Sequence, residues 1–231
     1  MKPICIIPAR GGSKGIAKKN IKMIAGKPLL GHVIEDIKRG NIFSHIIVST
    51  EDKEIAKIAE KYGAEVPFLR PKKLATDKAS MNDVLLHGIN QLDKLGFNFD
   101  IMVIRDCTVP FIRNKDIKGS INHLKKNKAD IVLGVYRQHL NPYFNMMEKN
   151  TDGFLRISKK IKNPIARRQD APIVYQLNGL FTMYIDRFQK YKKTLMPKSL
   201  PYEIPQETGL MIDTELEFQL AQYIVKHKLI S

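Results

Sequence analysis

The sequence predicts an α/β fold, a Rossmann-like open sheet that is mostly parallel and has helices on both faces. Three observations support this prediction. Short apolar runs of strand length alternate with segments of helical period. Glycine, proline and asparagine interrupt the alternation at short intervals. The first apolar run leads directly into a glycine-rich loop. Sheets of this kind bind ligands at the carboxyl ends of their strands, so we expect the functional residues there.

The predicted elements alternate along the first 136 residues. Strands are expected at residues 4–8, 45–50, 65–69, 101–104 and 130–136, and helices at 29–39, 53–62, 80–95 and 116–126. The alternation lapses at about 138–175, where strand and loop residues show no helical period, and this segment is predicted to be an inserted dimerisation arm. A core strand returns at 177–185. A last helix is expected at 213–227, with Leu216, Leu220, Tyr223 and Ile224 at helical spacing. We therefore predict one domain over residues 1–231.

The composition indicates a globular protein without a membrane segment. Hydrophobic residues make up 43% of the chain and charged residues 27%, and no apolar run reaches the roughly 18 residues that a membrane span needs. The apolar start is short and indicates a buried strand rather than a signal sequence. Cys5 and Cys107 fall in or beside predicted strands, which favours reduced thiols and a cytoplasmic location.

A formal net charge of +16 favours anionic partners. The lysines are spread over unrelated segments, and no zinc spacing, RNA-binding motif or basic zipper is present. Nucleic acid is therefore unlikely as a partner. A small anionic substrate is the better explanation of the positive charge, although a solvated lysine-rich surface is the simplest alternative.

The loop after the first strand has the composition of a phosphate site. Glycine lets the backbone approach a phosphate closely, its amides can point inward, and nearby cations neutralise the charge. The candidate residues are Ala9, Arg10, Gly11, Gly12, Ser13, Lys14 and Gly15, followed by Lys18, Lys19 and Asn20. Neither GxxxxGK[ST] nor GxGxxG is present, so a P-loop ATPase or a dehydrogenase is not supported. An ordinary glycine turn is the alternative, but its position after the first strand favours a triphosphate.

Four separated motifs resemble the CMP-sialic acid synthetase (acylneuraminate cytidylyltransferase) family. They are IIPARGGSKGIAKKNIKMIAGKPLLGHVI, IIVSTEDKEIAKIAEKYGAEVPFLRPKKLATDKAS, RRQDAPIVYQLNG and IDTELEF, in that order along the chain. The segments RDCTVPFIR and NPYFNMMEKN are closer to the branch that handles legionaminic-type sugars. The resemblance implies that the anomeric hydroxyl of a nine-carbon 2-keto-3-deoxy sugar acid attacks the α-phosphate of CTP. It also implies a requirement for Mg²⁺ and release of pyrophosphate.

The resemblance also implies roles for individual residues. Arg10 and Lys19 are the candidates for holding the triphosphate and its developing charge, unless they are only surface cations. Asn20, Arg70 and Ser80 match positions that the family uses around the cytidine, although Arg70 could equally serve as a structural cap.

A sugar carboxylate and its hydroxyls need a guanidinium group and amides. Arg167, Arg168, Gln169 and Asn178 can supply these groups. In the family the arm also forms a homodimer and lends residues to the neighbouring site. The alternative is that the two arginines lie in a solvated turn or make a purely dimeric contact.

The predicted metal site departs from the family pattern. The family typically has IDIDTELD near its end, whereas this chain has LMIDTELE, so Met211 replaces the first aspartate and Asp213 keeps the second. A thioether is not a ligand for Mg²⁺, which prefers oxygen. Asp106 follows a buried strand, and the legionaminic-like branch carries an aspartate in that segment, so Asp106 and Asp213 are predicted to bind the metal. Asp106 could instead form a turn, and Asp213 could cap the last helix.

Two other functions are compatible with these observations. Another acidic sugar, as in CMP-KDO synthesis, could be the acceptor, because fold and phosphate loop do not determine it. A non-catalytic nucleotide-binding or nucleic-acid-binding module would share the basic loop but release no pyrophosphate.

Overall fold

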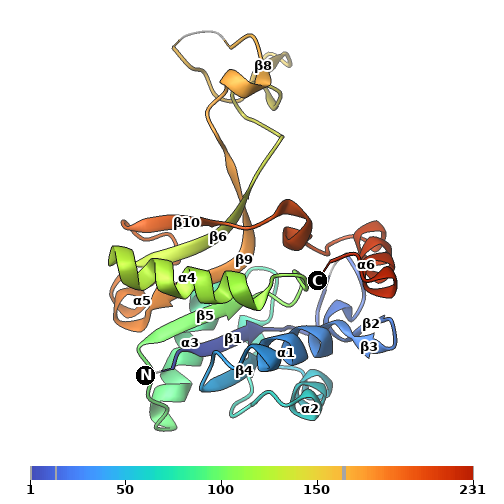
Figure 1. Ribbon diagram of the computed structural model, residues 1–231, viewed down its shortest axis with the longest axis vertical. Coiled ribbons are helices and arrows are strands. Elements are labelled where there is room, and N and C mark those ends of the chain that lie inside the picture. Colours follow the sequence, from blue (N-terminus) through green and yellow to red (C-terminus); the bar gives the residue numbers. More distant parts are fainter. Residues whose placement is uncertain (1, 14, 163–164, 231) are drawn as a thin grey trace.

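A six-stranded sheet forms the centre of the molecule (Figure 1). The computed structural model describes residues 2–13, 15–162 and 165–230. The strands lie in the order β10-β6-β9-β5-β1-β4, and β9 alone among them runs antiparallel to its neighbours. Their bounds are β1 (Ile4–Pro8), β4 (His45–Ser49), β5 (Ile101–Arg105), β6 (Ile131–Arg137), β9 (Tyr175–Tyr184) and β10 (Ser199–Glu203). The sequence prediction of an α/β, mostly parallel sheet is confirmed.

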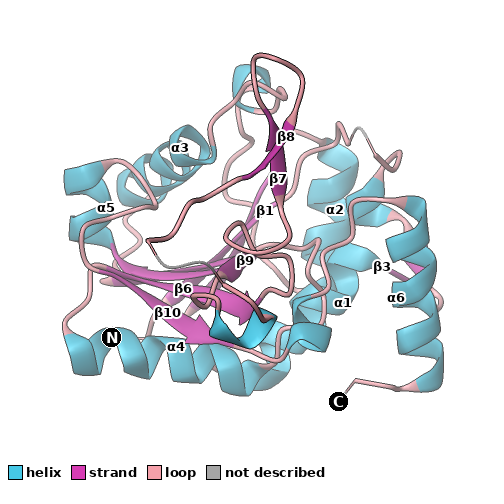
Figure 2. Ribbon diagram, turned by 90° about the horizontal axis from the view of Figure 1, so that it is seen from above, coloured by secondary structure: helices cyan, strands magenta, loops and turns pink. Residues whose placement is uncertain are grey.

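Helices cover both faces of this sheet. They are α1 (Leu29–Gly40), α2 (Lys53–Tyr62), α3 (Met81–Lys94), α4 (Asn114–Asn127), α5 (Ile185–Tyr191) and α6 (Glu215–His227). Side chains of α1, α2 and α4 form one apolar cluster with Cys5 and Ile7 of β1, and side chains of α3 and α5 form another with Ile4 and Ile6. This division follows from the alternation of side chains along a strand. Figure 2 shows α4 and α3 on opposite sides of the sheet.

Side-chain caps fix where three helices begin. Asp52 accepts hydrogen bonds from the amides of Glu54 and Ile55 at the start of α2, and Ser80 accepts one from the Asn82 amide at the start of α3. Thr214 and Glu217 form a capping box at the start of α6. The cap of α6 is therefore Thr214, which leaves the Asp213 side chain available for other contacts.

The arm extends away from the sheet as a continuation of two central strands (Figure 1). β6 and β9 lead into it, and it carries the hairpin of β7 (Met147–Lys149) and β8 (Leu155–Ile157). Its apolar side chains are largely exposed: Leu140, Met146, Met147, Phe154, Leu155, Ile157, Ile161 and Ile173. The predicted insertion at 138–175 corresponds to this arm, and its role in dimerisation stays a prediction.

One prediction of secondary structure was wrong, and the predicted last helix is confirmed as α6. Residues 65–69 form no strand, because a single bridge between Glu65 and Ile47 is the only strand-like pairing of that segment. In α6, Leu216, Leu220 and Tyr223 are exposed, whereas Phe218, Ala221 and Ile224 are buried. Both sides of α6 carry apolar residues, so the helical period alone could not identify the buried side.

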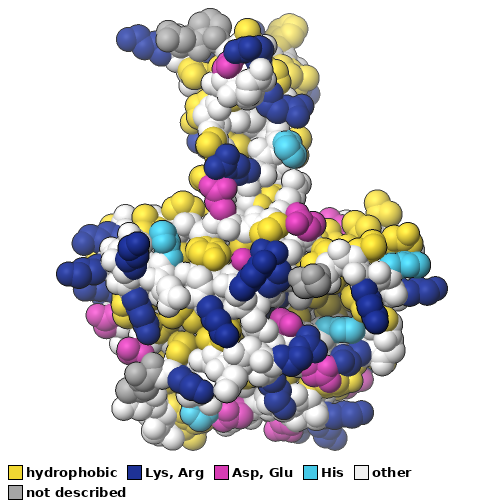
Figure 3. Space-filling view, in the orientation of Figure 1, with side chains coloured by type: hydrophobic (Ala, Val, Ile, Leu, Met, Phe, Trp, Pro, Cys, Tyr) yellow, Lys and Arg dark blue, Asp and Glu magenta, His cyan; other side chains and the backbone are white. Residues whose placement is uncertain are grey.

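No helix among the described residues is both long enough and apolar enough to cross a membrane. Lys and Arg side chains are spread over the visible face rather than gathered in one patch (Figure 3).

Candidate active site

A cavity of about 370 Å³ opens where β1 and β5 end. Its lining includes eight of the candidate residues of the sequence analysis, namely Arg10, Ser13, Gly15, Lys19, Asn20, Arg70, Asp106 and Asp213. Pro8, Met81, Cys107, Thr108 and Met211 complete it. The cavity lies at the carboxyl ends of parallel strands, where an open α/β sheet binds its ligands.

Lys19 connects the glycine loop to the segment before α6. Its side chain is almost fully buried, and its ammonium group donates hydrogen bonds to the Ile212 carbonyl oxygen at 2.6 Å and to Asp213 Oδ1 at 2.8 Å. Gly15 lies against the same segment, because a Cβ at this position would be 2.1 Å from the Asp213 carbonyl oxygen. Residues almost two hundred positions apart therefore form one wall of the cavity.

Asn20 holds the glycine loop against the strand end that carries Asp106. Asn20 Nδ2 donates to the Arg10 carbonyl oxygen at 2.8 Å, and the Cys107 thiol donates to Asn20 Oδ1 at 2.9 Å. Burial raises the pKa of the Cys107 thiol, so it remains protonated and can act as this donor. The Arg10 guanidinium forms an ion pair with Asp77 at 2.8 Å and also lines the cavity.

Arg70 is buried at the edge of the cavity. Its guanidinium donates to the Ser49 carbonyl oxygen at 3.0 Å and lies 3.4 Å from Glu51 Oε2, and burial lowers its pKa. Arg70 Nε is buried without a hydrogen-bond partner among the described residues. The other Glu51 oxygen accepts from the Gly11 amide at 2.7 Å. Glu51 thus joins Arg70 to the glycine loop, a role that sequence reasoning missed although Glu51 lies just past a predicted strand.

Two carboxylates line the cavity from different segments. Asp106 Oδ1 accepts hydrogen bonds from the amide and the hydroxyl of Thr108, each at 2.9 Å, and Asp213 Oδ1 accepts from Lys19. One oxygen of each carboxylate has no hydrogen bond to any described residue. Oxygen donors of this kind suit Mg²⁺, which usually takes one or two carboxylates together with substrate phosphates and water. In the part of the chain that the structure describes, no cluster of three or more His, Cys, Asp or Glu could hold a metal without such added ligands.

The remaining nucleotide-site candidates lie around the cavity rather than on its wall. Ala9 is fully buried behind the loop, Gly11 packs against Asp52, and Gly12 faces open space. Ser80 caps α3, and its neighbour Met81 lines the cavity instead. Lys14 lies outside the described residues.

The predicted sugar-binding residues are not part of this cavity wall. Arg167, Arg168 and Gln169 are exposed at a 3₁₀ turn of the arm, and Arg167 forms an ion pair with Asp170 at 2.9 Å. Asn178 is fully buried in β9, where its Oδ1 accepts from the Leu180 amide. Its Nδ2 is buried without a hydrogen-bond partner in the described chain. One chain therefore does not bring this group together.

A second, smaller cavity of about 320 Å³ adjoins the first. The two share Pro8, Met81, Asp106 and Met211. The smaller cavity is otherwise lined by Ile104, Leu177, Gly179, Phe181, Thr194 and Leu195. Gly179 has a φ of +78°, and a Cβ there would lie 2.6 Å from the Asp106 Cβ, so only glycine allows β9 to approach Asp106 this closely. Asp106 thus stands at the junction of a polar cavity and a more apolar one.

Comparison with known proteins agrees with this geometry. A family model described as "Cytidylyltransferase" matches residues 4–222. The chain belongs to the cytidylyltransferase family. The pseudaminic acid cytidylyltransferase of Campylobacter jejuni is 31% identical over 99% of both chains. The CMP-N,N'-diacetyllegionaminic acid synthase of the same species is 29% identical over 99% of this chain and 97% of its own.

The fold of this cytidylyltransferase is also found among solved structures. CMP:2-keto-3-deoxy-manno-octonic acid synthetase, solved in complex with CTP, superposes with a TM-score of 0.73 at 17% identity. The match covers 99% of this chain and 100% of the other. At that identity it supports the fold.

Proposed function

We propose that this cytidylyltransferase transfers CMP from CTP to the anomeric hydroxyl of a nonulosonic acid, a nine-carbon 2-keto-3-deoxy sugar acid. One observation carries the proposal. A single cavity at the strand ends combines two cations of the first loop, Arg10 and Lys19, with two carboxylates from distant segments, Asp106 and Asp213. Cations placed beside carboxylates can bind a triphosphate and a divalent ion together. The named relatives that act on pseudaminic and legionaminic acids support the acceptor class.

The proposed reaction exchanges one phosphorus–oxygen bond for another. The anomeric oxygen of the sugar forms a bond to the α-phosphorus, the bond from that phosphorus to the bridging β-phosphate oxygen breaks, and the hydroxyl proton passes to solvent. Pyrophosphate leaves with the electrons of the broken bond. Arg10 and Lys19 would stabilise negative charge that develops on the phosphates, which is the main requirement of nucleotidyl transfer.

Asp106 and Asp213 would hold Mg²⁺ together with the phosphates. When bound, the ion would neutralise triphosphate charge and polarise the α-phosphate. The free carboxylate oxygen of each residue supports this assignment. Met211 lines the same cavity but offers no oxygen.

The acceptor would occupy the adjoining cavity, with its anomeric centre toward Asp106. Leu177, Phe181 and Leu195 would contact apolar parts of the sugar, such as acyl groups. None of the described residues that line that cavity is a cation, so the sugar carboxylate would need a guanidinium group from elsewhere. We propose that Arg167, Arg168 and Gln169 supply this contact from a partner's arm in a homodimer, with the buried Asn178 supporting the floor of the site. The arm projects away from the sheet of its own chain and exposes apolar residues that a second chain would cover.

A cytoplasmic location belongs to the same proposal. Cys5 and Cys107 are buried as free thiols. Burial raises the pKa of the Cys5 thiol to about 12, which keeps it unreactive. Reduced, packed cysteines are typical of a reducing compartment such as the cytoplasm, where CTP is present.

The experiment that tests the function measures pyrophosphate release from CTP with Mg²⁺ and a panel of acidic sugars. The panel contains N-acetylneuraminic, legionaminic and pseudaminic acids, with KDO as the eight-carbon alternative. We expect release only with a nine-carbon acid, together with a CMP-sugar product of matching mass. Release with KDO alone would assign the alternative acceptor class, and CTP binding without release for any acid would favour a non-catalytic module.

A further inference from the structure

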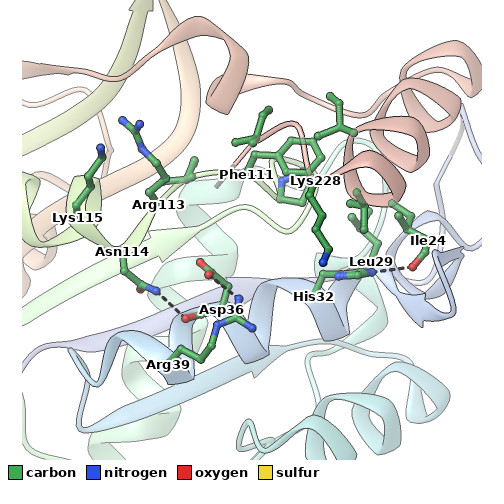
Figure 4. A pocket seen from close by; sticks show the side chains of 15 residues that line it. Ile24, Leu29, His32, Asp36, Arg39, Phe111, Arg113, Asn114, Lys115 and Lys228 are labelled. Carbon is green, nitrogen blue, oxygen red and sulfur yellow. Dashed lines mark hydrogen bonds and ion pairs between the residues drawn. The ribbon is translucent and has the colours of Figure 1, made fainter.

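Another cavity among the described residues lies away from the site above. It has a volume of about 540 Å³ and lies between α1, the segment 110–115 at the start of α4, and the end of α6 (Figure 4). It shares no lining residue with the two cavities at the strand ends. Its volume is in the range of small-molecule sites.

Its lining combines an apolar floor with a cationic rim. Ile24, Leu29, Phe111, Ile224 and Val225 supply the apolar surface. The rim carries Arg39, Arg113, Lys115 and Lys228, and Asp36 is the one carboxylate of the lining. Figure 4 shows these charged side chains distributed around the cavity, from α1, the start of α4 and the end of α6. Such a surface favours a ligand with an apolar body and a negative charge.

Two of the rim cations are already neutralised and two are not. Arg39 forms an ion pair with Asp36 at 3.0 Å, and Arg113 forms one with Asp116 at 2.7 Å. Within the described residues, no carboxylate lies within ion-pairing distance of Lys115 or Lys228. The cavity therefore has a local excess of two positive charges.

The start of α4 adds to this positive field. Arg113 is its N-cap residue but makes no side-chain hydrogen bond to the first-turn amides. The positive end of the helix lies beside the rim, and Asp116, which pairs with Arg113, is the acidic residue of its first turn. His32 Nε2 bonds to the Ile24 carbonyl oxygen at 2.7 Å, and burial lowers the pKa of this histidine. The imidazole is therefore neutral near pH 7 and adds no charge to the rim.

Three chain segments run from the active site to this cavity. One segment passes from Lys19 and Asn20 to Ile24 and α1, and another passes from Asp213 along α6. The remaining segment is the loop after β5, which places Asp106 in the active site and Phe111 at the cavity only a few residues later.

The loop after β5 is held together by the buried guanidinium of Arg105. This group donates to the Asp106 carbonyl oxygen at 2.8 Å, to the Val109 carbonyl oxygen, and to the Ile112 carbonyl oxygen at 3.5 Å. Both ends of the loop are thus tied to one side chain. A shift at Phe111 would reach Asp106 through this short bonded connection.

We propose that this cavity is a second binding site, for a small-molecule anion with an aromatic or aliphatic body, and that its occupancy changes the affinity of the active site for CTP. The apolar floor binds the body, and the unpaired charges of Lys115 and Lys228, on opposite sides of the cavity in Figure 4, attract the anionic group to its rim. The site does not depend on which sugar is the acceptor, and its occupancy is measurable without turnover.

The first test uses calorimetry on the full chain saturated with CTP and without acceptor, so that the phosphate loop is blocked. The probes are phenyl phosphate, inorganic phosphate and phenol. We expect one phenyl phosphate to bind per chain. Inorganic phosphate and phenol should each bind at least about tenfold more weakly, because the first lacks the aromatic ring and the second lacks the anionic group.

Matched variants locate the site. Lys115→Glu with Lys228→Glu should weaken phenyl phosphate binding by about a hundredfold, because two attractive charges of the rim become repulsive. Lys118→Glu with Lys226→Glu makes the same charge change at exposed positions of the same helices that do not line the cavity. This control should bind like the parent. Equal loss in both variants would show a general charge effect and overturn the site.

The coupling is tested separately by the Kd for CTP with and without saturating phenyl phosphate. We expect a change of about fivefold in the parent and none in the Lys115→Glu, Lys228→Glu variant, as for a typical coupling between two sites. A change that persisted in the variant would show competition at the phosphate loop instead. An unchanged Kd in the parent would overturn the coupling. Failure of the sugar assay would leave these results unaffected, so the two proposals fail independently.

Discussion

The glycine loop and the arm are both irregular segments, but they differ in how they are supported. Lys19 and Asn20 of the loop region are buried and bonded to residues far along the chain. Phe154 and Leu155 of the arm are about two-thirds exposed and pack against no buried cluster. The loop region is therefore supported within one chain, whereas the arm exposes apolar side chains that its own described residues do not cover.

The largest expected effect concerns the two loop cations. Arg10→Ala and Lys19→Ala should each lower kcat by about a hundredfold to a thousandfold, since a charged contact to the reacting phosphates is worth about 3–4 kcal/mol. Steady-state pyrophosphate release measures this effect. Circular dichroism of both variants serves as the folding control, and activity within a few-fold of the parent would contradict the assignment.

The second prediction concerns the carboxylates. Asp106→Asn and Asp213→Asn should each abolish Mg²⁺-dependent transfer, because the amide keeps the shape of the side chain and removes its negative charge. Met211→Asp should be tolerated, since it restores a carboxylate to a residue that already lines the cavity. A Mg²⁺ titration of each variant decides this, and unchanged Mg²⁺ dependence in Asp106→Asn would exclude it as a ligand.

The third prediction separates two glycines of the same loop. A Cβ at Gly15 would be 2.1 Å from the Asp213 carbonyl oxygen, whereas a Cβ at Gly12 would meet nothing within 4 Å. Gly15→Ala should therefore lower the midpoint of thermal unfolding, because a backbone contact cannot yield as a flexible side chain does. Gly12→Ala should keep the parental midpoint and raise the KM for CTP, since its added methyl group would face the phosphates. Equal midpoints for the two variants would contradict the described packing.

The smallest expected effect is a partial recovery of activity, and it tests whether the arm of one chain acts on the active site of its partner. If Arg168 acts on the partner's site, a Lys19→Ala chain mixed with an Arg168→Ala chain should form one intact site per mixed dimer. Random mixing of the two inactive variants makes about half of the dimers mixed, and each mixed dimer has one intact site of two. The mixture should therefore recover about one quarter of the rate of the unmodified protein. Restoration is measured after co-refolding, with each variant alone as control. No recovery, together with light scattering that shows dimers, would place Arg168 in its own chain's site, and an Arg168→Ala control as active as the unmodified protein would place it outside catalysis.

Much of this organisation could be predicted from the sequence. The buried strands and the loop that follows the first of them carry local signals, and Arg10, Lys19, Asp106 and Asp213 do line one cavity. The contacts that join them could not be predicted, because the bond from Lys19 to Asp213 spans most of the chain. The reversed direction of β9 also leaves no local signal, since an antiparallel central strand has the same apolar pattern as a parallel one.

Ser80 and Leu216 show two further limits of sequence reasoning. Ser80 matched a nucleotide-binding position, but in the structure its hydroxyl caps α3. A serine before a helix suits both roles, so the residue type does not distinguish them. Leu216 follows the helical period of α6 but is exposed, because α6 packs on the side that carries Phe218.

The long strands β6 and β9 have a mechanical consequence. They pair with each other in the middle of the sheet and continue into the arm, with a register shift between Leu133 and Val135. A force on the arm would therefore be carried by backbone hydrogen bonds into the centre of the domain rather than absorbed by a soft tether. In a homodimer of the proposed kind, this stiffness would fix the distance and angle between the two active sites.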